Sequence, residues 1–157
     1  SALIFNSNQR SLVIEDFYPQ SAFLFVTKNG HKYVISKKEE MLDGSKYQDI
    51  TISKNLILAS KGDNLFDIYD FNLSLIKANL SMVESNDYPF IHADVFVFSD
   101  QKLEEPWWES KTVRKFYIWD DKSAKMNSIM GLGVVDCNGH LLLYLDENKN
   151  YKILQID

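Results

Sequence analysis

Several residue types are scarce in this chain of 157 residues, which has one cysteine, three prolines, six glycines and three histidines. With Cys137 alone, no intramolecular disulfide and no cysteine pair for metal or redox chemistry can form. The low glycine and proline content argues against a collagen-like or linker-rich chain. No run of eighteen apolar residues occurs, so we expect no membrane-spanning helix and no membrane insertion. Nothing indicates an oxidising compartment, so we expect a cytoplasmic protein, although the start Ser1-Ala2-Leu3 leaves a removed signal peptide open.

Motifs that usually mark enzymes are also missing. The sequence has no glycine-rich phosphate loop, Gly-x-Ser-x-Gly elbow, His-Glu-x-x-His pair or Cys-x-x-Cys pair. We therefore expect a protein that is not an enzyme and holds no metal or cofactor. His92 and Asp94 keep a metal-dependent hydrolase as an alternative, because residues at i and i+2 share one face of a strand. His31 and His140 follow equivalent turns and could pair only if those turns met in space.

The charge balance is acidic, with a formal net charge of −5. A nucleic-acid-binding protein usually carries a basic face, and the composition shows none, so we expect no nucleic-acid partner. Nine acidic and four basic residues lie between Glu84 and Asp121, a local balance equal to that of the whole chain. This concentration suits docking on a basic protein.

The aromatic share of 13% favours pleated, half-buried strands over helices. The tripeptide Asn-Gly-His occurs at residues 29–31 and 138–140, each time between β-rich runs, and Asn-Gly is a strong hairpin signal. The pattern predicts hairpins at 22–36 and 132–145, and further strands at 50–60, 65–69, 73–80, 91–99, 115–120 and 151–156.

A helix is predicted over residues 100–112. Pro106 suits a first helical turn, Glu104 and Glu105 lie near its positive end, and Lys111 and Arg114 follow at the other. Residues 37–41 are also compatible with a short helix. We therefore predict a single mainly β domain over 1–157, an antiparallel, meander-rich sandwich or barrel with one or two short helices.

The segment from Gly131 to Gly139 is similar to the short bacterial WG repeat, with Leu132 where that family has tryptophan. This resemblance covers nine residues and implies an alternative fold, a partial β-propeller-like repeat. The two Asn-Gly-His copies are 109 residues apart, and no copy recurs between them at a fixed period, which a repeat array should show.

Trp107 and Trp108 are the main candidates for function. Neighbouring residues diverge by about 100° on a helix and point to opposite faces on a strand, so one core can hardly bury both. One tryptophan should therefore lie at a surface, an interface or a pocket mouth, unless a loop covers it at the edge of the core. We predict a partner-binding set of two tryptophans and six carboxylates: Trp107, Trp108, Asp100, Glu104, Glu105, Glu109, Asp120 and Asp121.

A small, acidic β protein without catalytic motifs resembles, in type, the immunity proteins of contact-dependent and polymorphic toxin systems of bacteria. That resemblance implies a protein that neutralises a cognate basic toxin, a nuclease, by occluding its active site. It rests on no shared motif, and no residue role is carried over from it. The alternative is a β-barrel that binds a small molecule or lipid in a cavity lined by aromatic residues, namely Phe96, Phe98, Phe116, Tyr117 and Trp119.

Overall fold

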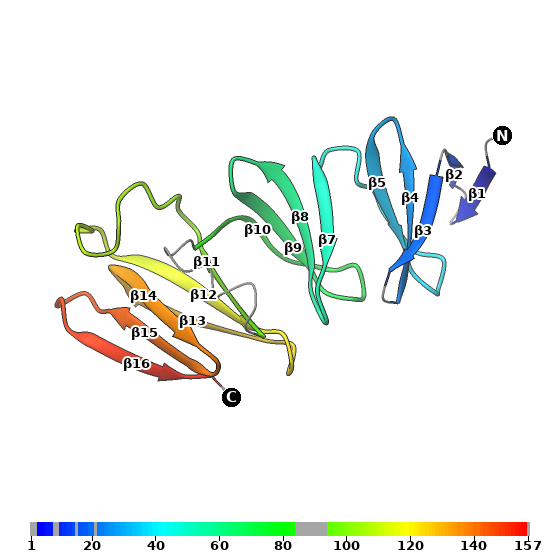
Figure 1. Ribbon diagram of the computed structural model, residues 1–157. Coiled ribbons are helices and arrows are strands. Elements are labelled where there is room, and N and C mark those ends of the chain that lie inside the picture. Colours follow the sequence, from blue (N-terminus) through cyan, green and yellow to red (C-terminus); the bar gives the residue numbers. More distant parts are fainter. Residues whose placement is uncertain (1–2, 8–9, 15, 21, 84–93, 157) are drawn as a thin grey trace. The chain divides into compact units, whose positions relative to one another are not determined.

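The computed structural model describes the backbone of residues 3–7, 10–14, 16–20, 22–83 and 94–156, and side chains from residue 22 onward. This part of the chain forms sixteen strands and no helix (Figure 1), so the mainly β prediction is confirmed and the predicted short helices are wrong. The strands are β1 Leu3–Ser7, β2 Arg10–Ile14, β3 Asp16–Gln20, β4 Phe23–Lys28, β5 His31–Ile35, β6 Met41–Leu42, β7 Asp49–Ile52, β8 Ile57–Gly62, β9 Leu65–Tyr69, β10 Leu75–Met82, β11 Val95–Ser99, β12 Arg114–Asp120, β13 Lys125–Gly131, β14 Gly133–Asn138, β15 Leu141–Leu145 and β16 Tyr151–Gln155.

The chain divides into two compact units, residues 1–78 and 79–157. Every described strand pair within them is antiparallel, and neighbouring strands follow one another along the chain. The described sheets are open, so the barrel alternative is wrong and the meander prediction holds. The single domain over 1–157 stays a prediction. The described part of the chain contains no helix that is long and apolar enough to cross a membrane.

The first unit contains a four-stranded sheet, β3-β4-β5-β6, and the meander β7-β8-β9. Its core is formed by one face of each, with Phe25 and Val34 from the first sheet and Ile50 and Ile57 from the meander. The alternation of side chains along a strand explains why only one face is buried. In β7, Asp49 and Thr51 are exposed, whereas the alternating isoleucines are buried. The predicted strand over 50–60 is interrupted at residue 53, where Ser53 Oγ accepts a hydrogen bond from Leu56 N at 3.1 Å.

Both Asn-Gly-His copies form hairpins, as predicted, but in different registers. In the first, Lys28 pairs with His31, and the loop residues Asn29 and Gly30 both have positive φ. In the second, Asn138 pairs with Leu141, so the loop is Gly139-His140, and of these two only Gly139 has positive φ. An irregularity between Val134 and Asp136 precedes this second turn.

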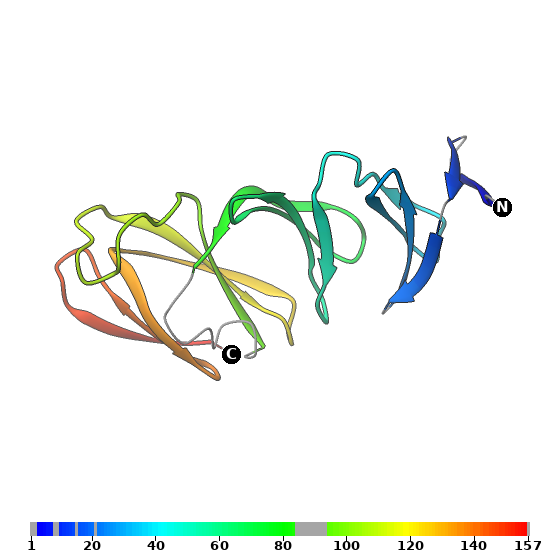
Figure 2. The ribbon, with the colours of Figure 1, turned by 45° about the horizontal axis from the view of Figure 1, so that its top comes forward.

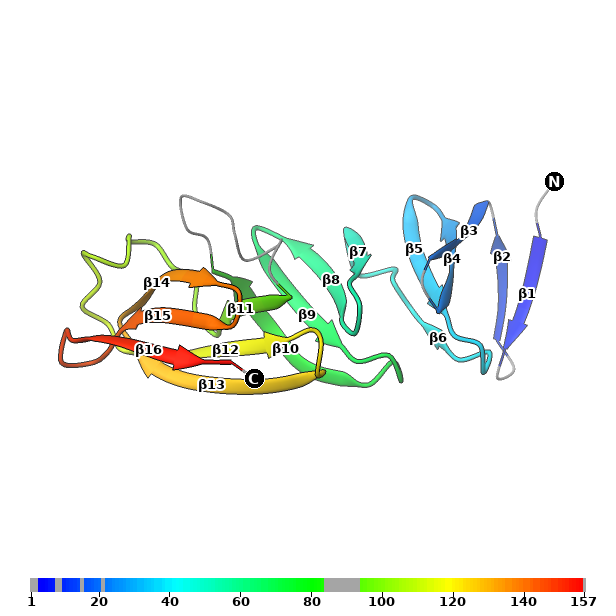
Figure 3. The same cartoon turned by 60° about the horizontal axis from the view of Figure 1, so that its bottom comes forward.

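The second unit is a two-layer sandwich. One layer ends in β11, β12 and β13, and the other is β14-β15-β16, whose order is plain in Figure 3. Figure 2 shows the yellow strands of the first layer above the orange and red strands of the second. Alternate residues of β11 and β12 (Val97, Phe116 and Ile118 among them) pack against Val134 and Leu142. Burial of these apolar faces stabilises the unit and fixes which side of β12 points inward.

One five-residue turn occurs three times, at residues 36–40, 70–74 and 146–150. In each copy the first side chain, Ser36, Asp70 or Asp146, accepts hydrogen bonds from the backbone N–H groups two and four residues later. The fourth residue has positive φ each time, between 61° and 63°. The helix expected at 37–41 is this turn, because the Ser36 hydroxyl caps it locally.

Candidate functional site

The predicted helix at 100–112 is replaced by an irregular loop, residues 100–113, which connects β11 to β12 and is called the Trp loop below. The loop contains one tight turn, in which Glu109 N donates to Pro106 O at 3.0 Å and Ser110 N donates to Trp107 O at 3.4 Å. These bonds span three residues, whereas an α-helix needs a ladder spanning four. Pro106 therefore begins a single turn rather than a helix.

Trp107 anchors the Trp loop to the second layer of the unit. A methyl group on Gly133 would lie 2.5 Å from Trp107 Cβ, so only glycine lets the loop approach the start of β14 this closely. The Trp107 ring also makes edge contacts with Tyr151, at 6.1 Å between centroids, and with Trp108, at 5.5 Å. These contacts anchor the loop at Trp107, although the loop forms no strand of either sheet.

Trp108 is 57% exposed, whereas Trp107 is partly buried, in agreement with the prediction that one of the pair reaches the surface. Four predicted partner-binding carboxylates, Asp100, Glu104, Glu105 and Glu109, are exposed on the same loop. Six of the eight predicted residues therefore lie on one short segment, with an aromatic ring among carboxylates.

Asp120 and Asp121 do not join that surface, because each is only 4% exposed. Asp121 Oδ1 accepts a hydrogen bond from Trp119 Nε1 at 3.0 Å. Asp120 accepts from Lys122 N at 3.0 Å and from Ser123 Oγ at 2.7 Å. Burial alone raises the pKa of Asp120, but these hydrogen bonds to the carboxylate outweigh it and hold the pKa below its usual value. Both residues build the turn between β12 and β13.

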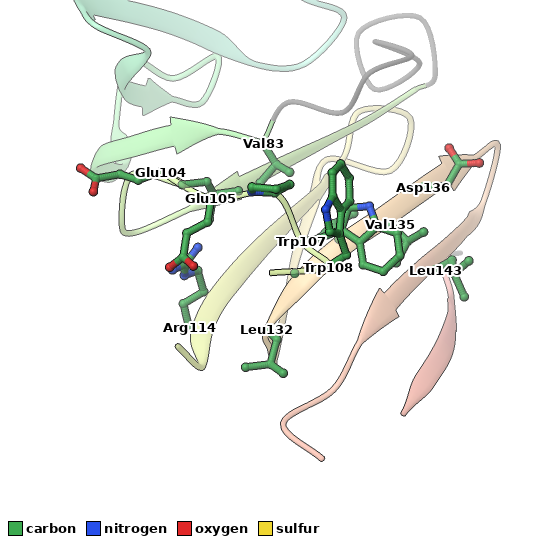
Figure 4. Close-up of a pocket in the computed structure, with 14 residues that line it drawn as sticks. Val83, Glu104, Glu105, Trp107, Trp108, Arg114, Leu132, Val135, Asp136 and Leu143 are labelled. Atoms are coloured by element: carbon green, nitrogen blue, oxygen red, sulfur yellow. The ribbon is translucent and has the colours of Figure 1, made fainter. Parts of the chain in front are cut away.

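A pocket of about 540 Å³ lies beside the Trp loop, wholly within the second unit (Figure 4). Most of its lining residues have apolar side chains, including Leu103, Pro106, Leu132, Leu143 and both tryptophans, while backbone and charged groups also face it. The charged residues of the lining are Glu104, Glu105, Arg114 and Asp136. The volume lies in the range of small-molecule sites, and the lining combines apolar side chains with four charged ones.

Sequence reasoning missed Arg114 as a site residue. Arg114 begins β12, only 6% of it is exposed, and it shares the inward face with Phe116 and Ile118. Within the described part of the chain, Arg114 Nε and Nη1 are buried and have no hydrogen-bond partner. Period-two alternation back from Phe116 would have placed this arginine on the buried face.

The histidines have structural partners. His31 Nδ1 lies 3.0 Å from Tyr47 O, and His140 Nδ1 lies 2.9 Å from Ile156 O. Because a carbonyl oxygen only accepts, each ring donates from Nδ1. His92 lies outside the described residues, and its proposed companion Asp94 forms an ion pair with Lys122 at 3.3 Å.

The described residues form neither a metal centre nor a reactive thiol site. Among the residues that the structure describes, no group of three or more His, Cys, Asp or Glu side chains could hold a metal ion. Cys137 is buried, and burial together with nearby Asp136 raises the pKa of its thiol to about 11. The thiol is therefore protonated near neutral pH and unsuited to nucleophilic attack.

The five aromatic residues proposed to line a ligand cavity are all buried, with at most 8% of any of them exposed, and none lines the pocket beside the Trp loop. They are Phe96, Phe98, Phe116, Tyr117 and Trp119. Their role in the described structure is to fill the two faces of β11 and β12.

The first unit contains a buried polar network. Tyr47 OH donates to Asp67 Oδ2 at 2.6 Å and contacts the Tyr69 hydroxyl, while Lys61 Nζ lies 2.9 Å from Asp67 Oδ1. Burial and the hydrogen bonds to Asp67 and Tyr69 raise the pKa of Tyr47 far above its usual value. Because the carboxylate is balanced by the lysine, we interpret this network as structural.

Comparison with known proteins gives no family for this chain. No family model matches it, and no curated protein matches its sequence. Among solved structures, Kluyveromyces lactis Hsv2 is 12% identical with a TM-score of 0.39, over 94% of this chain and 51% of that one. KlHsv2 with loop 6CD replaced by a Gly-Ser linker gives 12% identity and 0.38, over 94% and 52%. The computationally designed Ika4 protein gives 10% and 0.33, over 92% and 91%.

This chain spans about half the length of the two Hsv2 structures. At TM-scores below 0.5 these similarities support no conclusion about fold or function.

Proposed function

We propose that this protein is a non-enzymatic binding module that docks on a basic protein through the Trp loop. The observation that carries the proposal is Trp108, a large aromatic side chain left 57% exposed on a loop that Trp107 fixes to the fold. Exposed tryptophans at a fixed position are the residues that most often dominate binding energy. A loop anchored before binding also loses less conformational entropy when it docks.

The charge of the Trp loop specifies the kind of partner. The exposed carboxylates of Asp100, Glu104, Glu105 and Glu109 lie around Trp108 in the sequence of one loop, and only Lys102 and Lys111 oppose them there. Such a surface attracts a basic protein and accelerates association at low salt. The same charge would repel nucleic acid, which is itself negative, so the proposal includes no nucleic-acid partner.

The specific form of this proposal is an immunity protein that occludes the active site of a cognate basic toxin, a nuclease. It is supported by the acidic loop with its exposed tryptophan and by the absence of enzyme motifs in the sequence. A cytoplasmic location belongs to the same proposal, because a toxin of this class acts there. A toxin gene beside the gene of this protein would favour this form over other binding modules.

The test is affinity capture from the native host with the tagged wild-type protein and with Trp108→Ser, followed by titration of the captured partner. We expect one stoichiometric basic partner, and a loss of roughly 2–4 kcal/mol of binding free energy in the variant. A triple variant, E104Q/E105Q/E109Q, should slow association and reduce its dependence on salt.

Leu75→Ser is the matched control, because Leu75 is 53% exposed but lies in the first unit. The control should bind as the wild-type protein does. A captured partner whose affinity is the same for Trp108→Ser and wild type would contradict the proposed surface, provided that both proteins are folded.

A further inference from the structure

Arg114 is a buried cation without a hydrogen-bond partner for two of its nitrogens, in the wall of the pocket beside the Trp loop. Buried charges in proteins are normally paired, because removing a charge from water without compensation is costly. A guanidinium is planar, always protonated, and its N–H groups match the oxygens of a carboxylate or phosphate. Both nitrogens are also closed to solvent, so we infer that Arg114 turns toward the pocket and pairs with an anionic group there when the pocket is occupied.

The other charges of the pocket narrow the class of anion. Glu104, Glu105 and Asp136 line the same pocket, so three carboxylates stand against one guanidinium. These carboxylates would strongly repel a doubly charged phosphate, whereas they would repel a singly charged carboxylate less. A ligand that also carries an ammonium group would be attracted by these carboxylates and by the faces of the two tryptophan rings.

The apolar lining indicates the remaining part of the ligand. Trp107, Trp108 and Leu143 face a volume of about 540 Å³, enough for an aromatic or aliphatic body as well as the charged groups. Figure 4 shows both indole rings between Arg114 on one side and Asp136 and Leu143 on the other.

We propose that this pocket binds a small zwitterion, an amino acid or amino-acid derivative with an apolar side chain, whose carboxylate pairs with Arg114. The ammonium group is held by the pocket carboxylates of Glu104, Glu105 and Asp136, and the side chain packs on the tryptophans. This site shares Trp108, Glu104 and Glu105 with the proposed docking surface, but ligand binding needs no protein partner and is measured without one.

The test is calorimetric titration of the intact protein with L-phenylalanine, 3-phenylpropionate, phenethylamine and inorganic phosphate. We expect saturable binding of L-phenylalanine, and affinities lower by about tenfold or more for the two compounds that lack one charged group. No saturable binding of L-phenylalanine, or tighter binding of phosphate, would overturn the proposal.

Arg114→Gln should lower the affinity for L-phenylalanine by about tenfold or more and leave the affinity for phenethylamine unchanged. The control Lys115→Gln removes the same charge from the neighbouring exposed residue and should bind as wild type does. Glu105→Gln should reduce the preference for L-phenylalanine over 3-phenylpropionate, because two of the three pocket carboxylates remain. Equal L-phenylalanine affinity in Arg114→Gln and wild type would overturn the proposal.

A measurement on the wild-type protein keeps the test decisive if Arg114→Gln does not fold. In NMR titrations with L-phenylalanine, the indole N–H signals of Trp107 and Trp108 should shift. The signal of Trp119, whose indole N–H is hydrogen-bonded to Asp121, should not shift. A shift of the Trp119 signal alone would place the ligand elsewhere and overturn the site. Because these titrations use no partner, their failure leaves the docking proposal standing, and the reverse also holds.

Discussion

His140 and Ile156 are joined by two hydrogen bonds, His140 Nδ1 to Ile156 O at 2.9 Å and Ile156 N to His140 O at 2.6 Å. His31 Nδ1 makes the same side-chain bond to Tyr47 O, also sixteen residues later. The histidine after each Asn-Gly pair thus fixes a segment that follows its hairpin. Both histidines therefore have a structural role in the described fold.

We predict that His140→Ala destabilises the end of β16. Loss of one hydrogen bond should cost about 1 kcal/mol of unfolding free energy and increase hydrogen exchange at Ile156. His31→Ala is the matched control and should increase exchange near Tyr47 while Ile156 keeps its protection. Equal exchange at Ile156 in His140→Ala and wild type would show that the side-chain bond is dispensable.

The close contact of Trp107 with Gly133 predicts a strong effect of one methyl group. In Gly133→Ala the new Cβ would lie 2.5 Å from Trp107 Cβ and 3.0 Å from Trp107 Cα, so the Trp loop must move. We expect a loss of about 1–3 kcal/mol in unfolding free energy and a change in tryptophan fluorescence. Ser128→Ala, on the exposed side of β13, should change neither, and normal fluorescence in Gly133→Ala would contradict this anchoring.

The buried network around Tyr47 predicts an alkaline limit to stability. The pKa of Tyr47 is raised in the folded state, so its contribution is complete below the unfolded pKa of about 10 and is lost as pH rises above it. Tyr47→Phe should lower the unfolding free energy by about 1–3 kcal/mol near neutral pH and weaken the decline above about pH 10. Denaturation at several pH values, with Tyr33→Phe as control, measures both effects.

The repeated turn predicts a stabilising substitution. Glu39 has φ of +62°, which costs an L-residue about 1–2 kcal/mol, whereas glycine adopts it freely. After the entropy of glycine in the unfolded chain is subtracted, Glu39→Gly should gain about 0.5–1 kcal/mol. Lys38→Gly, one residue earlier in the same turn, should destabilise instead. Thermal unfolding of the two variants should therefore shift in opposite directions.

Most strands could be predicted from the sequence because their signals are local. Apolar alternation and Asn-Gly fixed the β4–β5 hairpin, and the last meander followed from apolar runs separated by the polar turn at 146–150. The first five-residue turn was missed because its copies share a backbone path and a capping side chain rather than a motif. Ser36 and Asp70 are different residues that cap in the same way.

The candidate site was only partly predictable. Local signals placed an exposed tryptophan among carboxylates, but they also favoured a helix, which the tertiary contact of Trp107 with Gly133 overrides. The burial of Asp120 and Asp121 depends on hydrogen bonds to the turn after β12. The pocket depends on β14 lying against the loop, and no property of residues 100–113 alone encodes that.

The anchoring of the Trp loop has a consequence for how new variants of this protein could arise. The loop contributes no strand to either layer, and its tryptophan at 107 meets the scaffold at a glycine. Substitutions at its exposed positions leave the sheet ladders and the buried apolar residues untouched. A lineage could therefore change what the loop recognises, one side chain at a time, while inheriting the same sandwich unaltered.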